Sequence, residues 1–129
     1  MKMQKRYIIA VSIILLFSLY ITLMLDTNNV IDDFIACVKN QNIREEVKDT
    51  ELYNWYNYKN TEIINDAAVD VKRIFVFHNF KQGVLCVNFT YKMFDENGNE
   101  IRCAHNVNSV WHIRKNDGYW NVVEIEQRP

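Results

Sequence analysis

The sequence predicts an α+β protein in which an N-terminal transmembrane helix is followed by helices packed on a curved four-stranded antiparallel sheet. Three observations lead to this fold class. The first 25 residues contain a long uncharged segment. The next part of the chain has apolar residues at helical spacing, and from Val69 onward the period changes to two. Helices and strands that are segregated along a chain are typical of helices packed on one face of a sheet.

The uncharged segment begins at Tyr7 and ends at Leu25. As a helix it would span about 28 Å at ~1.5 Å per residue, close to the ~30 Å hydrocarbon core of a bilayer. It is apolar on all sides, whereas a helix of a small soluble domain has one apolar stripe. We therefore expect an N-terminal tip and transmembrane anchor over residues 1–25 and one domain over residues 26–129.

Two other uses of this segment stay open. A cleaved signal peptide would also begin with positive charge, but the segment is longer than the ~7–15 apolar residues of a signal peptide, and no small-x-small cleavage pattern follows it. A lipoprotein needs a small residue before the modified cysteine, and Ala36 does precede Cys37. However, Phe34 stands where Leu is usual, and acidic residues separate this motif from the apolar segment. Both comparisons favour an uncleaved anchor.

The charges beside the anchor predict its orientation. Lys2, Lys5 and Arg6 precede it, and the positive-inside rule keeps such an end in the cytoplasm. Of the 15 basic and 16 acidic residues only these three lie before Tyr7, which leaves the rest of the chain with a net charge of −4. We expect a single-pass protein of the cell membrane with its C-terminal domain outside. A mildly acidic domain argues against nucleic acid as a partner, because basic patches supply most of that binding.

Helices are predicted directly after the anchor. Residues 27–29 offer side chains that cap a helix N-terminus, and one apolar stripe follows on a helix of about three turns: Val30, Ile31, Phe34, Ile35 and Val38. A less regular helical stretch over 43–58 carries an aromatic cluster: Tyr53, Trp55, Tyr56 and Tyr58. The cluster could line a pocket, bind a glycan or lie on the bilayer surface. The interpretation we favour is that its rings cap the open sheet as packed core.

Four strands are predicted over residues 69–80, 84–94, 101–113 and 119–126. Odd-numbered residues face the core on the second and third strands: Leu85, Val87, Phe89, Tyr91, Met93, Ile101, Cys103, Val107, Trp111 and Ile113. Paired residue numbers must then sum to an even value, which a two-residue Asn-Gly turn does not allow. We expect a three-residue loop with Gly98, or a bulge, and pairs that sum to 196.

This register makes a disulfide between Cys86 and Cys103 implausible. Cys103 would oppose Met93, while Cys86 would oppose Val110 on the other face of the sheet. Three cysteines are not a disulfide framework, and their spacing matches no zinc pattern. We expect small buried hydrophobic side chains, and no metal or cofactor site.

In the last hairpin, a two-residue Asn-Asp turn would pair Ile113 with Trp120, and Trp111 with Val122. Ile125 then has the wrong parity for the core face. We therefore expect a bulge near residues 122–123, or a strand covered on both faces.

The same hairpin resembles the closing hairpin of NTF2-like proteins. It reads W-H-I at 111–113 and K-N-D-G-Y-W at 115–120, followed by Val122 and Ile125, similar to the W-x-I…(D/N)-G-x-W-x-(V/I) pattern of that superfamily. By element order the resemblance covers about residues 30–127. It implies a cystatin-like cone of helices over a long curved sheet, most similar to small membrane-anchored or lipoprotein members of bacteria. The superfamily includes isomerases, dehydratases and cyclases, as well as binding, assembly and secretion modules that often dimerise through the sheet.

One group of side chains has the composition of a catalytic pocket. His105 falls on the predicted core side of its strand, and Tyr91 would oppose it in the 196 register. Asp66 or Asp70 could approach from the start of the first strand, and an acidic neighbour would tune His105 as a base. A strand histidine beside a tyrosine is usually only a hydrogen-bonded part of the structure, so no catalytic residue is assigned.

The sequence therefore predicts a non-enzymatic, membrane-anchored extracytoplasmic module that binds or scaffolds. Its partners would be the membrane, through residues 7–25, and a protein or a second copy of the chain, through the sheet. Two alternatives stay open. One is a small-ligand-binding or enzymatic cone that uses His105 and Tyr91. The other is an accessory protein of an envelope or secretion assembly.

Overall fold

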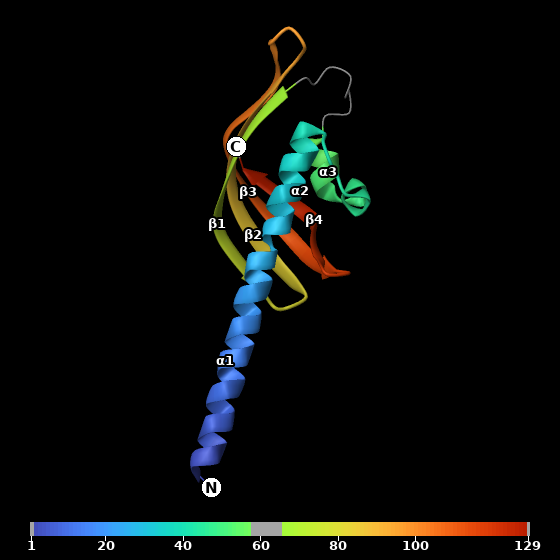
Figure 1. The fold of residues 1–129 in the computed structure, drawn as a ribbon. Helices are drawn as coiled ribbons and strands as arrows, with labels where there is room; N and C mark the ends of the chain where they lie inside the picture. Colours follow the sequence, from blue (N-terminus) through green and yellow to red (C-terminus); the bar gives the residue numbers. More distant parts are fainter. Residues whose placement is uncertain (1, 58–65, 129) are drawn as a thin grey trace.

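The computed structural model describes residues 2–57 and 66–128 (Figure 1). Two long helices come first, followed by a short 3₁₀ helix, a short α-helix and four strands. In chain order these elements are α1 (Lys2–Asp26), α2 (Asn28–Lys39), η1 (Glu45–Asp49), α3 (Glu51–Tyr56), β1 (Asp66–His78), β2 (Gln82–Phe94), β3 (Glu100–Asn116) and β4 (Tyr119–Arg128). The predicted α+β class is confirmed. Tyr58 and the predicted connector after it lie outside the described residues.

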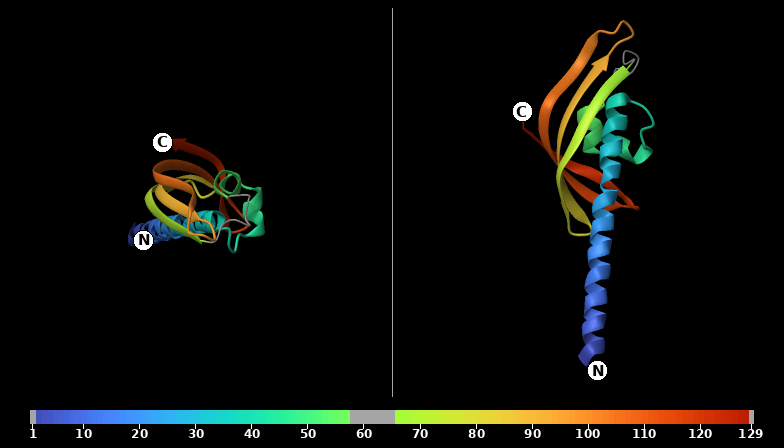
Figure 2. Two further views of the ribbon diagram at one scale, coloured as in Figure 1. Left: turned by 90° about the horizontal axis from the view of Figure 1, so that it is seen from above. Right: turned by 60° about the vertical axis from the view of Figure 1, so that its left-hand side comes forward.

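The four strands form one antiparallel sheet in the order β1-β2-β3-β4, so each strand pairs with its neighbour in the chain. The sheet is strongly curved, and α2, η1 and α3 lie against its concave side (Figures 1 and 2). We call this side the core face and the opposite side the outer face. The arrangement leaves β1 and β4 as the two edges of the sheet.

Helices α1 and α2 are almost one continuous rod (Figure 2). Thr27 alone separates them, and its backbone keeps helical angles, with φ −62° and ψ −14°. Thr27 is the N-cap residue of α2, but the predicted capping by its side chain is wrong: it makes no capping hydrogen bond, and its hydroxyl donates to the Met24 carbonyl at 2.6 Å. The segment Gln4–Lys39 is one helix that is long and apolar enough to cross a membrane.

The core lies between α2, α3 and the core face of the sheet. Phe34 of α2 is fully buried, and its ring centroid lies 4.8 Å from Phe89, 4.8 Å from Tyr56 and 5.2 Å from Trp111. These four rings come from four different elements. Their burial gives the domain its main apolar stabilisation, since each aromatic side chain removes a large area from water.

The predicted register is confirmed over the part of the β2–β3 pair that lies next to the β1–β2 hairpin. From Gln82↔Arg114 to Phe89↔Val107 the paired numbers sum to 196, and Cys86 opposes Val110 as expected. The register then shifts between Phe89 and Tyr91 and again between Met93 and Phe94. The expected bulge is therefore present. The strands end at Phe94 and Glu100, and beyond them the Asp95 N–H donates to the Asn99 carbonyl at 2.9 Å, which leaves three residues, 96–98, in the loop, Gly98 among them.

The predicted pairs of the last hairpin are wrong, whereas its predicted bulge is confirmed. The turn is Asp117-Gly118, with φ values of 50° and 82°, so Ile113 pairs with Val122 instead of Trp120. Asp and Gly tolerate these angles better than Asn116 and Asp117 would together. The register then shifts by one residue at Val123, which brings Ile125 opposite Trp111 on the core face.

Candidate functional site

The predicted pairing of His105 with Tyr91 is wrong. Tyr91 pairs with Ala104, and Lys92 instead of Met93 pairs with Cys103. The cause is a bulge at Asn106, whose φ of 52° inserts one residue into β3 and reverses the facing of the strand beyond it. His105 and Cys103 are consequently exposed, while Tyr91 is 4% exposed in the core. The two side chains do not form a common site.

Tyr91 lies in solid aromatic packing. Its ring stacks on Phe89 at 5.8 Å and meets Phe34 edge-on at 6.3 Å, with the Arg102 guanidinium 5.8 Å from its centroid. Desolvation by burial raises the pKa of the Tyr91 hydroxyl above its ordinary value, although Arg102 opposes this shift. A phenol held neutral in this way is suited to packing and not to proton abstraction.

The aromatic cluster of α3 is divided between the core and the surface. Tyr56 is buried, and its hydroxyl donates to Gln127 Oε1 at 2.8 Å and accepts from Trp111 Nε1 at 3.3 Å. Burial raises the pKa of Tyr56. Trp55 is 41% exposed and Tyr53 is half-buried. For Tyr56 the interpretation as packed core is confirmed.

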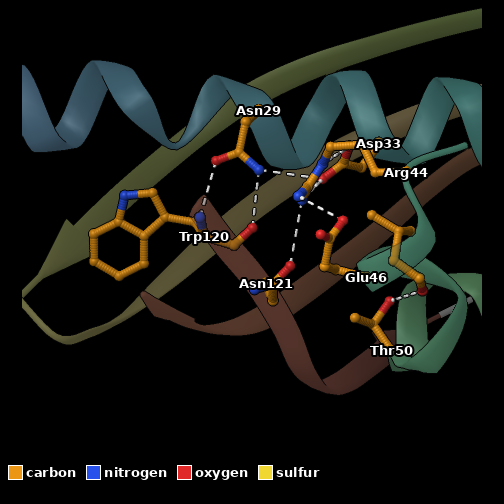
Figure 3. A network of polar contacts seen from close by, with 8 residues as sticks. Asn29, Asp33, Arg44, Glu46, Thr50, Trp120 and Asn121 are labelled. Carbon is orange, nitrogen blue, oxygen red and sulfur yellow. Dashed lines mark hydrogen bonds and ion pairs between the residues drawn. The ribbon is translucent and has the colours of Figure 1, made fainter. Parts of the chain in front are cut away.

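The most connected polar group of the domain joins α2 to β4 and to the segment before η1 (Figure 3). Asp33 is buried, and it accepts from Arg44 Nε at 3.2 Å and from Arg44 Nη2 at 2.9 Å. Asn29 bridges the backbone of Trp120: its amide donates to the Trp120 carbonyl at 2.9 Å, and its oxygen accepts from the Trp120 N–H at 3.1 Å. A bidentate pair of this kind holds its partners in one geometry.

This group was missed at the sequence level. The signal was the position of Asp33, which lies three residues after Val30 and four before Cys37 on the apolar stripe of its helix. A carboxylate there requires a partner when it is buried. Nothing in the local sequence indicated that Arg44, eleven residues later, would be that partner.

A hollow of about 390 Å³ opens beside Arg44. Its lining includes Arg44 and three acidic residues, Glu46, Asp49 and Asp117. The Arg44 guanidinium lies 4.0 Å from the Tyr119 ring centroid, and the hydrogen bond with Asp33 raises the pKa of Arg44 further. Since its one cation is already paired and its rim is acidic, the hollow is a poor anion site. The role that its contacts support is structural: the polar group holds α2 and the segment before η1 against β4.

The outer face of the sheet carries an apolar surface. Ile74, Phe75 and Phe77 of β1 are 62%, 56% and 53% exposed. Their strand neighbours are half-buried: Val84 pairs with Phe77, Cys86 pairs with Phe75, and Val110 pairs with Cys86. We call these six residues the outer apolar patch. Exposed aromatic side chains that gather on one sheet face mark an interaction surface more often than isolated ones do.

The cysteines and acidic residues supply no metal site over the ranges that the structure describes, because no three His, Cys, Asp or Glu side chains gather there. Cys37 is buried, Cys86 is half-buried and Cys103 is exposed. Burial, with Asp33 nearby, raises the pKa of the Cys37 thiol to about 12. A thiol held protonated in this way is a packing group and not a nucleophile.

Fold and surface together define the class of protein: an α+β domain with a packed core, continuous with a long apolar N-terminal helix. The chain matches no family model, no curated protein and no solved structure.

Proposed function

We propose that this chain is a single-span membrane protein whose folded domain lies outside the cytoplasm and self-associates through the outer apolar patch. The observation that carries the proposal is the contrast along the first helix. Its side chains from Tyr7 to Leu19 are exposed on all sides, with Phe17 at 64%, yet the same rod continues into the core as α2. An apolar surface of this length is stable in hydrocarbon and costly in water.

The orientation is supported by charge. Lys2, Lys5 and Arg6 flank the N-terminal end of the apolar segment, and Asp26 is the first charged residue at its other end. Basic residues are retained on the cytoplasmic side of a membrane. The domain would then face outward.

The choice of a second copy as the partner follows from symmetry. Strand β1 runs broadly along the α1–α2 rod, whereas β4 runs obliquely to it (Figure 1). The part of the outer face that β1 forms therefore stands roughly parallel to the direction in which α1 leaves the domain. A twofold axis along that direction brings two outer faces together and keeps both anchors in one bilayer. An isologous interface needs only one self-complementary patch, and anchoring in one membrane raises the local concentration of copies.

The NTF2-like resemblance remains a proposal about ancestry and shape. Its support is the element order, with helices before four antiparallel strands, and the closing hairpin from Trp111 to Ile125. A cone that held a ligand would need an open interior. The packing of Phe34 against Phe89 and Trp111 argues against that use, so the enzymatic alternative has no supporting geometry.

The test is the oligomeric state of the full chain, by sedimentation equilibrium in detergent micelles and by energy transfer between labelled copies in vesicles. Wild type is expected to be dimeric. Phe75→Asp should weaken the dimer at least tenfold, because it places charge in the patch. Lys72→Gln, on the same outer face, changes the charge in the same direction and should remain dimeric.

A monomeric wild type, or a Phe75→Asp variant that dimerises as well as wild type, would overturn self-association through this patch. If wild type is monomeric but captures a different protein through the patch, the accessory role in an envelope or secretion assembly becomes the better proposal. The anchor is tested separately by extraction: alkaline carbonate should leave the chain in the membrane pellet.

A further inference from the structure

The tip of the β1–β2 hairpin lies beside the last part of the apolar helix. His78 Nε2 donates to the Tyr20 carbonyl at 2.8 Å, and the two rings stack with centroids 3.9 Å apart. Phe80, at the tip, meets the Tyr20 ring edge-on at 5.8 Å. Leu23 is also buried against the domain. The folded domain therefore begins at the level of Tyr20 and not at the end of the apolar segment.

This junction shortens the part of the helix that is free to cross a membrane. Residues 7–19 form thirteen helical positions, or about 20 Å at ~1.5 Å per residue. A hydrocarbon core is ~30 Å thick, so ~10 Å of it must be crossed by the helix from Tyr20 onward, together with the parts of the domain that lie beside it. Asp26, which ends the apolar segment, comes about 9 Å further along the helix. The hairpin tip lies within this interval.

The conformation of the tip is unusual for its sequence. Phe80 has a φ of 75°, a left-handed angle that a bulky side chain adopts only at a cost of about 1 kcal/mol or more. Its N–H donates to His78 Nδ1 at 3.0 Å, and Asn79 Oδ1 accepts from Gln82 N–H at 2.9 Å. Glycine or asparagine would suit this turn better. Phe80 is nevertheless 40% exposed, so part of it is available to surroundings outside the domain.

Three basic residues lie at or beside the tip. Lys81 follows Phe80 directly, and the Lys115 N–H donates to the Lys81 carbonyl at 2.8 Å, which joins the end of β3 to the tip. Arg114 pairs with Gln82. Within residues 79–82 and 114–118 Asp117 is the one acidic residue against these three basic residues. An aromatic ring flanked by lysine and arginine is suited to the boundary between acyl chains and anionic headgroups.

We propose that the hairpin tip of residues 79–82 is inserted in the headgroup region of an anionic phospholipid bilayer, on the same side as the domain. The proposal rests on the anchor described under the proposed function and adds a second membrane contact to it. The Phe80 ring enters the acyl boundary, while Lys81, Arg114 and Lys115 reach lipid phosphates. Together with the His78–Tyr20 contact, the tip sets the height and tilt of the domain above the membrane.

The experiment places a nitroxide at single cysteines of the full chain, in vesicles of phosphatidylcholine and phosphatidylglycerol. All variants carry Cys86→Ala and Cys103→Ser, and they keep Cys37, which is buried and is expected to stay unlabelled in the folded chain. Phe80→Cys reports the tip, Leu15→Cys reports the anchor, and Asn97→Cys reports the exposed turn at the opposite end of the sheet. Collision rates with dissolved oxygen and with a water-soluble nickel chelate give the depth of each label. Unfolding monitored by tryptophan fluorescence, to which the buried Trp111 and Trp120 and the exposed Trp55 contribute, checks that each variant is folded.

The expected result is a ratio of oxygen to nickel collisions at position 80 that lies several-fold above that at position 97 and below that at position 15. Replacing phosphatidylglycerol by phosphatidylcholine should reduce the depth at position 80 and leave position 15 unchanged. A label at 80 that is as accessible to nickel as the label at 97, while position 15 is in hydrocarbon, overturns the tip contact and leaves the anchor intact. An aqueous label at position 15 overturns both.

Discussion

Helices α1 and α2 form one rod, but they differ in burial: most of α1 is exposed, whereas one face of α2 is buried in the core. In α1 the apolar side chains point in all directions, and Ile8, Leu15 and Phe17 are each about two-thirds exposed. In α2 one face is buried against the sheet, and the other carries Asp32 and Lys39. Local conformation is the same on both sides of Thr27. The difference lies in what each half packs against.

The comparison shows how a polar residue can be tolerated in a buried helix face. Asp33 lies among Val30, Phe34 and Cys37 because Arg44 and Asn29 satisfy its oxygens. The uncharged segment from Tyr7 to Leu25 has only hydroxyl groups as polar side chains, and Thr22 returns its hydroxyl to the Ser18 carbonyl at 2.8 Å. In α2 the buried carboxylate is paired with side chains from elsewhere in the chain, whereas in α1 the Thr22 hydroxyl is paired with a carbonyl of its own helix.

The largest expected difference is between two ring truncations, one in α2 and one in α1. Phe34→Ala should lower the free energy of unfolding of the domain by about 3–5 kcal/mol, because it leaves a cavity among four other rings. Phe17→Ala should change it by less than about 0.5 kcal/mol, since Phe17 touches no core. The measurement is chemical unfolding of the full chain in micelles, followed by tryptophan fluorescence. Equal losses in the two variants would contradict the contrast.

A smaller effect is expected from two neighbouring acidic residues of α2. Asp33→Ala should cost about 1–3 kcal/mol, because Arg44 and Asn29 lose a buried acceptor. Asp32→Ala, one residue earlier and exposed, should stay within about 0.5 kcal/mol of wild type. If Arg44→Ala alone costs as much as Asp33→Ala and the double variant costs no more than either, the pair acts as one unit. Additive losses would show that the two residues act separately.

Alkaline pH should destabilise the folded chain through the thiol of Cys37. The pKa of Cys37 is raised from its ordinary value near 9 to about 12 in the folded chain. The folded state therefore holds this proton more tightly than the unfolded state, so its contribution to stability is complete below pH 9 and is lost as pH rises towards 12. The slope from this group should reach about 1.4 kcal/mol per pH unit. Cys37→Ala should flatten the stability curve above pH 9. An unchanged slope would mean that the thiol ionises freely in the folded state.

Thiol labelling below pH 9 compares the buried Cys37 of α2 with the exposed Cys103. Cys103 is exposed and should react with a maleimide in the native state, whereas Cys37 should react only after unfolding. Rapid native labelling of Cys37 would contradict the packing of α2.

Much of the fold could be predicted from the sequence because its signals are local. The periods of 3.6 and two identified α2 and the strands. The parity of Ile125 predicted either a bulge near residues 122–123 or a strand covered on both faces, and the structure has the bulge. The turn Asp117-Gly118 was missed by one residue, because Asn116-Asp117 offers similar side chains and only the pairing across the sheet decides between them.

The predicted candidate site failed for a different reason. His105 and Tyr91 were brought together by extending one register along the whole strand. The sheet curves over Phe34, and a twisted strand relieves that curvature at bulges such as the one at Asn106, where the φ is positive. One inserted residue then exchanges the two faces of the strand beyond it. No local pattern around His105 indicates where the curvature will require a bulge.

The amino-acid sequence by itself determined the long apolar helix, the order of helices before strands and most of the residues that form the core, since each depends on the composition and period of a short segment; Cys103, predicted on the core face, is exposed. Tertiary structure alone decided which face His105 occupies, that Arg44 pairs with Asp33, and that the domain begins at Tyr20 within the apolar segment. These three features depend on contacts between residues far apart in the chain, where packing of the curved sheet against the helices selects among locally equivalent arrangements.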